Sequence, residues 1–164
     1  FIKPDHKYLV GDISVVPIKL SHDTVCCLGY LMKEMNTVDN ISFASITDTG
    51  YIDKKYYKIL SYIHTILIES NHDPEMLLNS GRPWFLINRI LSDNGHMSNA
   101  QCVKHLKSII SEHNKNIILG HISEECNEYD LAYNYCLNEF KDDRKFNLTV
   151  ALQHTEHPLI KIGE

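Results

Sequence analysis

The sequence lacks the features that define several protein classes. No apolar run approaches the roughly 18 residues of a membrane-spanning helix, and no basic-then-apolar signal segment opens the chain. The five cysteines are odd in number and include no C-x-x-C pair, so neither a disulfide framework nor a zinc knuckle is indicated. No internal repeat or low-complexity tract is present. These absences favour a protein of the reducing cytoplasm with no membrane partner.

The chain also lacks an excess of positive charge. Its formal net charge is −5 at pH 7, whereas proteins that hold nucleic acid through a broad electrostatic field are usually basic. Any contact with nucleic acid is therefore expected to be local. A metal site would change this balance, because divalent cations place strong positive charge where a phosphate has to sit.

What is present is the composition of a globular protein. Apolar residues make up 43% and charged residues 23% of the 164 positions, and both fractions are close to globular averages. This length fits one domain with a sizeable core, so residues 1–164 are assigned to a single domain. The chain begins with Phe1 rather than methionine, and we expect it to be a piece of a longer product.

Hydrophobic periodicity predicts a β-meander followed by strands that alternate with helices. The predicted strands span residues 11–20, 25–32, 41–47, 65–68, 116–120, 148–153 and 159–162. The first predicted helix spans about 53–62, the second begins at Pro74 with Asp73 as its cap, and the third spans 99–113 with Ser98 as its cap. Residues 123–127 lead into a last helix that continues to about Phe140. Residues 84–91 fit either a helix or a connecting loop. This order is typical of a mixed α/β layered fold.

Several predicted strands end in a titratable side chain. The run T-I-L-I-E-S-N-H-D begins at Thr65, and two further runs deliver Asp48 and His121, while the first strand leads to His22. Strand ends hold side chains rigidly and leave them accessible, as a metal site requires. His22, Asp48 and His121 are therefore candidate ligands, and their imidazole and carboxylate groups suit zinc, manganese or iron. Taken singly, each is more often a cap, a surface group or a core group.

A second constellation involves His96 and Glu69. His96 follows a glycine that permits a tight backbone, and the helix start after it offers free N–H groups to an anion. A carboxylate such as Glu69 would fix the tautomer of this ring and leave its other nitrogen to deliver a proton. Spacing alone favours the plainer interpretation, an ordinary strand-end carboxylate and a turn histidine. The neighbouring candidates for supporting the site or contacting substrate are Asn71, His72, Ser98 and Asn99.

Six segments, in this order, resemble one known family. They are V-V-P-I-K-L-S-H-D, C-L-G-Y, I-T-D-T-G-Y, L-I-E-S-N-H-D, R-I-L-S-D-N-G-H-M-S-N and L-G-H-I-S-E-E-C-N. Together they extend over nearly the whole chain and are similar to the YycJ (WalJ) group of metallo-β-lactamase-fold hydrolases. The resemblance, and not periodicity or spacing, carries this identification.

The resemblance implies an αββα sandwich with a dinuclear metal site at one edge of its two sheets. His22 matches the histidine that binds the first metal, Asp48 the carboxylate that bridges both metals, and His121 the last histidine, on the second metal. His96 and Glu69 match the mobile catalytic histidine of ribonuclease Z and β-CASP nucleases and the acid that orients it. The group is associated with phosphodiester chemistry, so the expected full-length protein is a metal-dependent phosphodiesterase, such as a DNA exonuclease, with nucleic acid or another phosphodiester as its substrate.

The chain departs from the family in one respect. The motif H-x-H-x-D-H, which supplies most ligands of both metals, is absent from these 164 residues. The chain therefore corresponds to roughly the C-terminal three-fifths of such a protein, with the N-terminal part of the fold outside it. Two divalent metal ions, zinc first and manganese or iron as alternatives, would be incompletely liganded, which predicts weak or partial metal binding and little activity by this chain alone.

Two alternative functions stay open. One is hydrolysis of a small cyclic phosphate or a lactone, which uses the same kind of metal centre. The other is a non-catalytic role, either as a degenerate fold used for interactions or as a stable half that needs a partner chain. The sequence does not indicate the oligomeric state.

Overall fold

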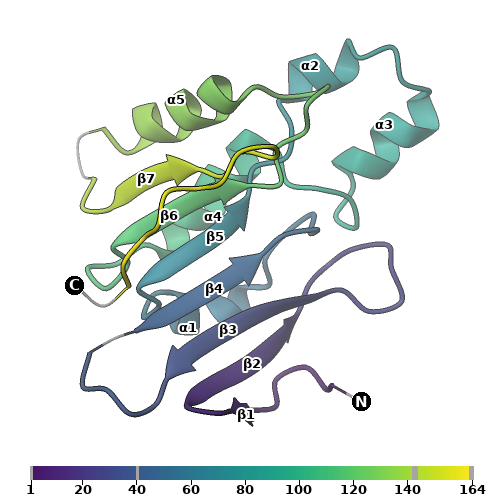
Figure 1. Cartoon of the computed structure of the whole chain (residues 1–164). Coiled ribbons are helices and arrows are strands. Elements are labelled where there is room, and N and C mark those ends of the chain that lie inside the picture. Colours follow the sequence, from purple (N-terminus) through teal and green to yellow (C-terminus); the bar gives the residue numbers. More distant parts are fainter. Residues whose placement is uncertain (1, 40, 142–143, 163–164) are drawn as a thin grey trace.

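A computed structural model describes residues 2–39, 41–141 and 144–162 of the chain. Its strands form a sheet in the order β1-β2-β3-β4-β5-β6-β7, so every neighbour in the sheet is also a neighbour in sequence (Figure 1). The strands are β1 (Tyr8–Val10), β2 (Ile13–Lys19), β3 (Leu28–Glu34), β4 (Ser42–Ile46), β5 (Thr65–Glu69), β6 (Asn116–Gly120) and β7 (Asn147–Val150). The mixed α/β architecture predicted from the sequence is confirmed.

Strand direction brings distant segments to one edge of the sheet. β1 to β4 pair in antiparallel fashion, whereas β4 to β7 pair in parallel. Because two antiparallel steps restore the direction, β2 runs the same way as β4, β5, β6 and β7. The carboxyl ends of these strands therefore lie along the same edge, which is where loops of α/β sheets build their sites.

The helices connect the parallel strands. The 3₁₀ turn η1 (Lys54–Tyr56) and α1 (Tyr57–Leu60) join β4 to β5, and α5 (Tyr129–Glu139) joins β6 to β7. Between β5 and β6 the chain forms α2 (Pro74–Leu78), α3 (Trp84–Leu91) and α4 (Asn99–Ile109). Figure 1 shows α2 and α3 beyond the carboxyl ends of the strands, away from the helices that cover the sheet. In the described part of the chain, no helix has the length and apolarity needed to cross a bilayer.

Two helix starts follow directly from their residues. The Asp73 side chain accepts hydrogen bonds from the backbone N–H groups of Glu75 and Met76, at 3.0 Å each, with Pro74 in the first turn of α2. Ser98 and Gln101 form a reciprocal capping box at the start of α4. Such side chains satisfy backbone donors that have no partner within the helix, and each cap stabilises its helix by about 1 kcal/mol. Both predicted caps are confirmed.

The two faces of the sheet differ in burial. Ala44, Ile66, Ile117 and Leu148 stand side by side across four strands and are buried in the core that α1, α4 and α5 complete. The alternate residues point to the other face, where Leu67 and its neighbours across the sheet are only partly buried. No helix of the described residues packs on that face as α4 does on the first. An αββα sandwich places its second sheet there.

Several predicted boundaries need correction. The strand predicted for 25–32 is β3, which begins and ends later, and the helix predicted for 53–62 is only a 3₁₀ turn followed by one turn of α1. The strand predicted for 159–162 is wrong, because this segment has no strand partner and Leu159 is fully exposed. Residues 84–91 form a helix, and the helix predicted to follow 123–127 is α5, which begins at Tyr129. The short edge strand β1 was not predicted.

The difference between the two faces can be measured on adjacent residues of β5. Ile66→Ala removes a side chain that is 0% exposed, so we expect a loss of about 3 kcal/mol in the free energy of unfolding. Leu67→Ala removes a half-buried side chain from the other face, and the expected loss is about 1 kcal/mol. Urea denaturation of both variants measures the difference. Equal losses would contradict the assignment of the core to the helix-covered face.

Candidate metal centre

Four candidate residues lie at the carboxyl edge of the sheet. His22 follows β2, Asp48 follows β4, Glu69 is the last residue of β5, and His121 follows β6. Asp48 and His121 both have a left-handed backbone, with φ of 60° and 55°, a conformation that costs non-glycine residues about 1 kcal/mol or more. The chain turns sharply at both positions immediately after a buried strand. The side chains therefore project over the edge of the sheet towards one another.

Glu69 is the centre of this arrangement. Its carboxylate is completely buried, and Oε2 accepts a hydrogen bond from the backbone N–H of Thr49 at 2.8 Å. Oε1 accepts one from Nδ1 of His96 at 2.7 Å and lies 3.3 Å from Nδ1 of His121. A buried carboxylate is stable only when such donors replace its lost hydration. One side chain therefore joins the ends of three strands and the loop before α4.

The charges of this cluster support one another. Burial alone would raise the pKa of Glu69, but its hydrogen bonds with His121 and His96 outweigh burial and hold the pKa below the usual value. The same hydrogen bond raises the pKa of His121, against the opposing effect of burial. Glu69 is therefore ionised at neutral pH and acts as the acceptor for both rings.

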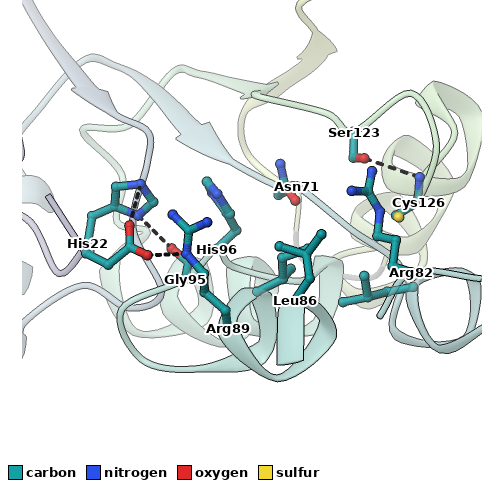
Figure 2. Close-up of a pocket in the computed structure, with 12 residues that line it drawn as sticks. His22, Asn71, Arg82, Leu86, Arg89, Gly95, His96, Ser123 and Cys126 are labelled. Carbon is teal, nitrogen blue, oxygen red and sulfur yellow. Dashed lines mark hydrogen bonds and ion pairs between the residues drawn. The ribbon is translucent and has the colours of Figure 1, made fainter. Parts of the chain in front are cut away.

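The three histidine rings lie next to one another. The ring of His96 lies between the other two, with centroids 4.9 Å from His22 and 5.2 Å from His121. His22 donates Nδ1–H to the carbonyl oxygen of Gly95 at 3.1 Å, and that loop contact is visible in Figure 2. In each ring Nδ1 is thus engaged with the protein and Nε2 is the nitrogen left for a metal, although Nε2 of His22 lies 3.6 Å from Oδ1 of Asp23. Metal-binding histidines are commonly oriented in this way by a carboxylate or carbonyl oxygen.

The donor atoms fit a divalent cation. Nitrogen and carboxylate oxygen atoms of His22, Asp48 and His96 lie within 4.8 Å of one another, and so do those of Glu69, His96 and His121. Nε2 of His121 also lies 3.5 Å from Oδ1 of Asp48. Imidazole and carboxylate donors at this separation match the ligand preferences of zinc and manganese. The predicted ligands His22, Asp48 and His121 are thus brought together, with His96 among them.

The loop that carries His96 is held by close backbone packing. A Cβ atom on Gly95 would lie 2.2 Å from the carbonyl oxygens of Arg89 and Ile90, so only glycine fits at this position. The backbone N–H of His96 donates to the same Ile90 carbonyl at 2.9 Å. The predicted tight backbone before His96 is therefore present. Glycine is required there because the backbone at the end of α3 lies too close for a side chain, and not because of a positive φ angle.

The four supporting candidates occupy different environments. Asn71 lies at the edge of a cavity beside His96 and donates to the carbonyl oxygen of His121 at 2.8 Å. Ser98 is used as the α4 cap. Asn99 is buried and belongs to a network with Ser70 and Asn127, with contacts of 2.7 to 3.1 Å. This network links the loops after β5 and β6 to the start of α4.

His72 lies beneath the site. It is 0% exposed, and among the described residues neither of its ring nitrogens has a hydrogen-bond partner. Burial lowers its pKa to about 4, an effect that the nearby Glu69 only partly offsets. His72 is therefore neutral at physiological pH, and it packs beneath the site away from solvent.

Sequence reasoning missed the groups that act through the backbone. The N–H of Thr49 and the carbonyl oxygen of Gly95 contact Glu69 and His22, and no side-chain pattern marks them. Asn127 was also missed, although it donates to the backbone carbonyl of Ser70 at 2.9 Å. Its position in E-E-C-N, shortly after His121, was the available signal.

Comparisons with known proteins find relatives over most of the chain. No family model matches the chain. Exodeoxyribonuclease WalJ of Streptococcus pneumoniae is 36% identical over 129 residues, which cover 79% of this chain and 46% of that relative. Exodeoxyribonuclease YycJ of Bacillus anthracis is 35% identical over 122 residues, or 74% of this chain and 45% of the relative. The chain thus spans about half the length of the curated relatives it matches.

Solved structures establish the fold. The metallo-β-lactamase fold protein YhfI from Bacillus subtilis superimposes with a TM-score of 0.64 at 14% identity, over 91% of this chain and 51% of that one. Zn²⁺-bound PqqB from Methylobacterium extorquens gives a TM-score of 0.57 at 14% identity, over 90% and 48% of the two chains. The fold is that of metallo-β-lactamase proteins, as predicted. Within this class, the chain is similar in sequence to the YycJ and WalJ relatives above, about half of whose length it spans.

The left-handed backbone at His121 predicts an unusual order of stability. His121→Ala and His121→Gly lose the same contact with Glu69, but only glycine adopts a φ of 55° without strain. We expect the glycine variant to be more stable than the alanine variant by about 1 kcal/mol in urea denaturation. At Glu124, where φ is not positive, the order should reverse. Alanine more stable than glycine at position 121 would contradict the strained conformation.

The stability of the folded chain should depend on pH through His72. Its pKa is about 4 in the folded chain and about 6.5 when unfolded. Between these pH values the unfolded state binds more protons, so the free energy of unfolding should fall as the pH is lowered from 6.5 to 4, by up to about 1.4 kcal/mol per pH unit. His72→Phe should flatten this dependence when urea unfolding is measured across the same pH range. A smaller dependence on pH should remain in this variant, because burial also lowers the pKa of His105 to about 4.

Proposed function

We propose that this chain is part of a metal-dependent phosphodiesterase that acts on DNA. The observation that carries the proposal is the convergence of His22, Asp48 and His121 with the Glu69–His96 pair at one edge of the sheet. The curated relatives are named exodeoxyribonucleases, which supports a nucleic-acid substrate. A diphosphatase of the PhnP family also shares the fold, with a TM-score of 0.52 at 14% identity over 88% of this chain and 43% of that one.

The metal ligands in this proposal are His22, Asp48 and His121. Each offers one donor atom, a ring nitrogen or a carboxylate oxygen. Zinc is the first candidate, with manganese or iron as alternatives. A divalent metal bound here would supply positive charge to the phosphate oxygens and acidify the attacking water. The backbone carbonyl of Gly95 and the Glu69 carboxylate would keep the rings of His22 and His121 oriented towards it.

His96 acts as the general acid in this proposal. Its Nδ1–H donates to Glu69, so a proton on Nε2 is the one that can reach the leaving oxygen of a cleaved phosphodiester. Glu69 stabilises the protonated imidazolium before transfer and fixes the tautomer afterwards. Because Glu69 is buried and held by the backbone of Thr49, it can orient the ring without meeting substrate.

The geometry also supports a second role for His96. Its donor atom lies within 4.8 Å of those of His22 and Asp48, so it could complete a metal site instead of transferring a proton. The two roles differ in their effect on metal content. A general acid can be removed without loss of the metal, whereas a ligand cannot.

The roles are tested on the protein that contains this chain and the rest of its coding sequence. We expect His96→Ala to lower turnover of a DNA substrate by 10²- to 10⁴-fold, the usual range for general acid catalysis, with the metal content unchanged. Asp48→Ala should lower both turnover and metal content. Plasma emission spectrometry measures bound metal, and release of nucleotides measures turnover. Metal lost with His96→Ala would assign His96 as a ligand, and full activity would remove it from the mechanism.

The expected incomplete ligand set is checked on the chain itself. Titration with Zn²⁺ should show weak or partial occupancy, because the described residues offer few ligands beyond those named above. Two tightly bound metal ions would contradict this. A panel of DNA, RNA, a cyclic nucleotide and a lactone, applied to the longer protein, separates the nuclease from the small-molecule alternatives.

A further inference from the structure

A cavity of about 240 Å³ lies between α3 and the candidate metal centre. Arg82, Leu86 and Arg89 line it from the α3 side, and His22 and His96 line it from the centre. Figure 2 shows Arg89 near His22 at one end and Arg82 near Ser123 at the other, with His96 and Asn71 between them. The cavity therefore leads from the metal centre along the length of α3.

The cavity wall carries two guanidinium groups, and the carboxylate of Asp23 lines it as well. Arg82 and Arg89 are two of the three arginines in a sequence with a formal net charge of −5. Each is paired with a carboxylate, Arg82 with Glu125 at 2.5 Å and Arg89 with Asp23. Such solvent-accessible ion pairs contribute little free energy, and a guanidinium has five N–H donors. Both arginines therefore keep terminal N–H donors for phosphate oxygens, although Nε of Arg82 is itself buried and has no partner among the described residues.

Two aromatic side chains stand beside these arginines. Trp84 and Phe85 begin α3 and are 64% and 74% exposed. Phe85 and Arg89 are four residues apart on the helix, so their side chains are neighbours on its surface. Ile87, which points away from Phe85 on the helix, packs with Leu77 and Cys126 in a small buried cluster. The helix is thus anchored by one face while its aromatic side chains remain free.

We propose that the segment from Arg82 to Ile90 binds unpaired nucleotides of a DNA strand on its way to the metal centre. The phosphates contact Arg82 and Arg89, and the bases stack on Trp84 and Phe85. The inference rests on the proposed function, because it assigns the surface that holds the substrate of that site. Proteins that bind single strands without sequence preference combine basic side chains, which contact the phosphates, with aromatic side chains, on which the bases stack. A docking face for another protein would not need both arginines on the wall of the cavity.

Trp84 provides a direct probe, because it is the single tryptophan of the chain. The full 164-residue chain is titrated in EDTA with oligothymidylate and, separately, with an abasic deoxyribose-phosphate oligomer of the same length. Oligothymidylate should quench the tryptophan fluorescence, since a stacked base contacts the indole. The abasic oligomer should bind more weakly and leave most of the fluorescence unchanged, because it offers phosphates alone.

Variants separate the two parts of the surface. Phe85→Ala should weaken oligothymidylate binding about tenfold, within the usual effect of one stacking residue, and affect the abasic oligomer little. Arg82→Ala with Arg89→Ala should weaken both ligands and reduce the dependence of binding on salt concentration. Arg144→Ala removes the third arginine, which is exposed after α5, and is the matched control with unchanged binding.

Three results would overturn the inference. They are no quenching by oligothymidylate, equal quenching by the abasic oligomer, and a fluorescence change on dilution that shows Trp84 in contact with a second copy. Binding in EDTA requires no turnover, so the outcome is independent of catalysis. Nuclease activity of the longer protein without a response of Trp84 refutes the surface alone, whereas a response without any hydrolysis refutes the proposed function.

Discussion

The structure of the site depends on one buried carboxylate. Glu69 lies at the end of a central parallel strand. Its buried charge is stable there only because N–H groups of Thr49, His96 and His121 point at its carboxylate oxygens. Those groups belong to the loops after β4 and β6 and before α4. The requirement to compensate one charge therefore positions three loops at once. Asp48, His121 and His96 lie on these loops, and His22, after β2, is held to one of them through the carbonyl oxygen of Gly95. The geometry of the metal centre is in this sense set by a residue that is out of reach of solvent.

The sequence predicted the parts of the fold that depend on side-chain periodicity. The strand 116–120 and the two helix caps were predicted correctly, because a short continuous apolar run and capping side chains are local signals. The predicted strand 159–162 is wrong for a tertiary reason, since an apolar run becomes a strand only where an edge of the sheet is available to pair with it. The helix 53–62 is short because its chain must return at once to β5, and α3 is a helix because Ile87 finds a buried cluster.

The site was predictable to the extent that it consists of side chains. Strand direction explains why His22, Asp48 and His121 meet, and the resemblance to a family supplied the pairing of His96 with Glu69, which the structure places at 2.7 Å. Backbone groups leave no trace in a sequence, so the N–H of Thr49 and the carbonyl of Gly95 were not foreseen. The arginines and aromatic residues of α3 were visible in the sequence but had no assigned role, because only the folded chain brings that helix against His96.

The contacts of Glu69 also bear on the order of events during folding. Its partners lie 20, 27 and 52 residues away along the chain, and parallel strands are joined only through long crossover connections. Contacts of such long range close late, after local structure. The donor atoms are therefore scattered in the unfolded chain and gather only when the sheet is complete. A metal ion would enter a finished cavity, in contrast to zinc fingers, where the ion itself drives folding.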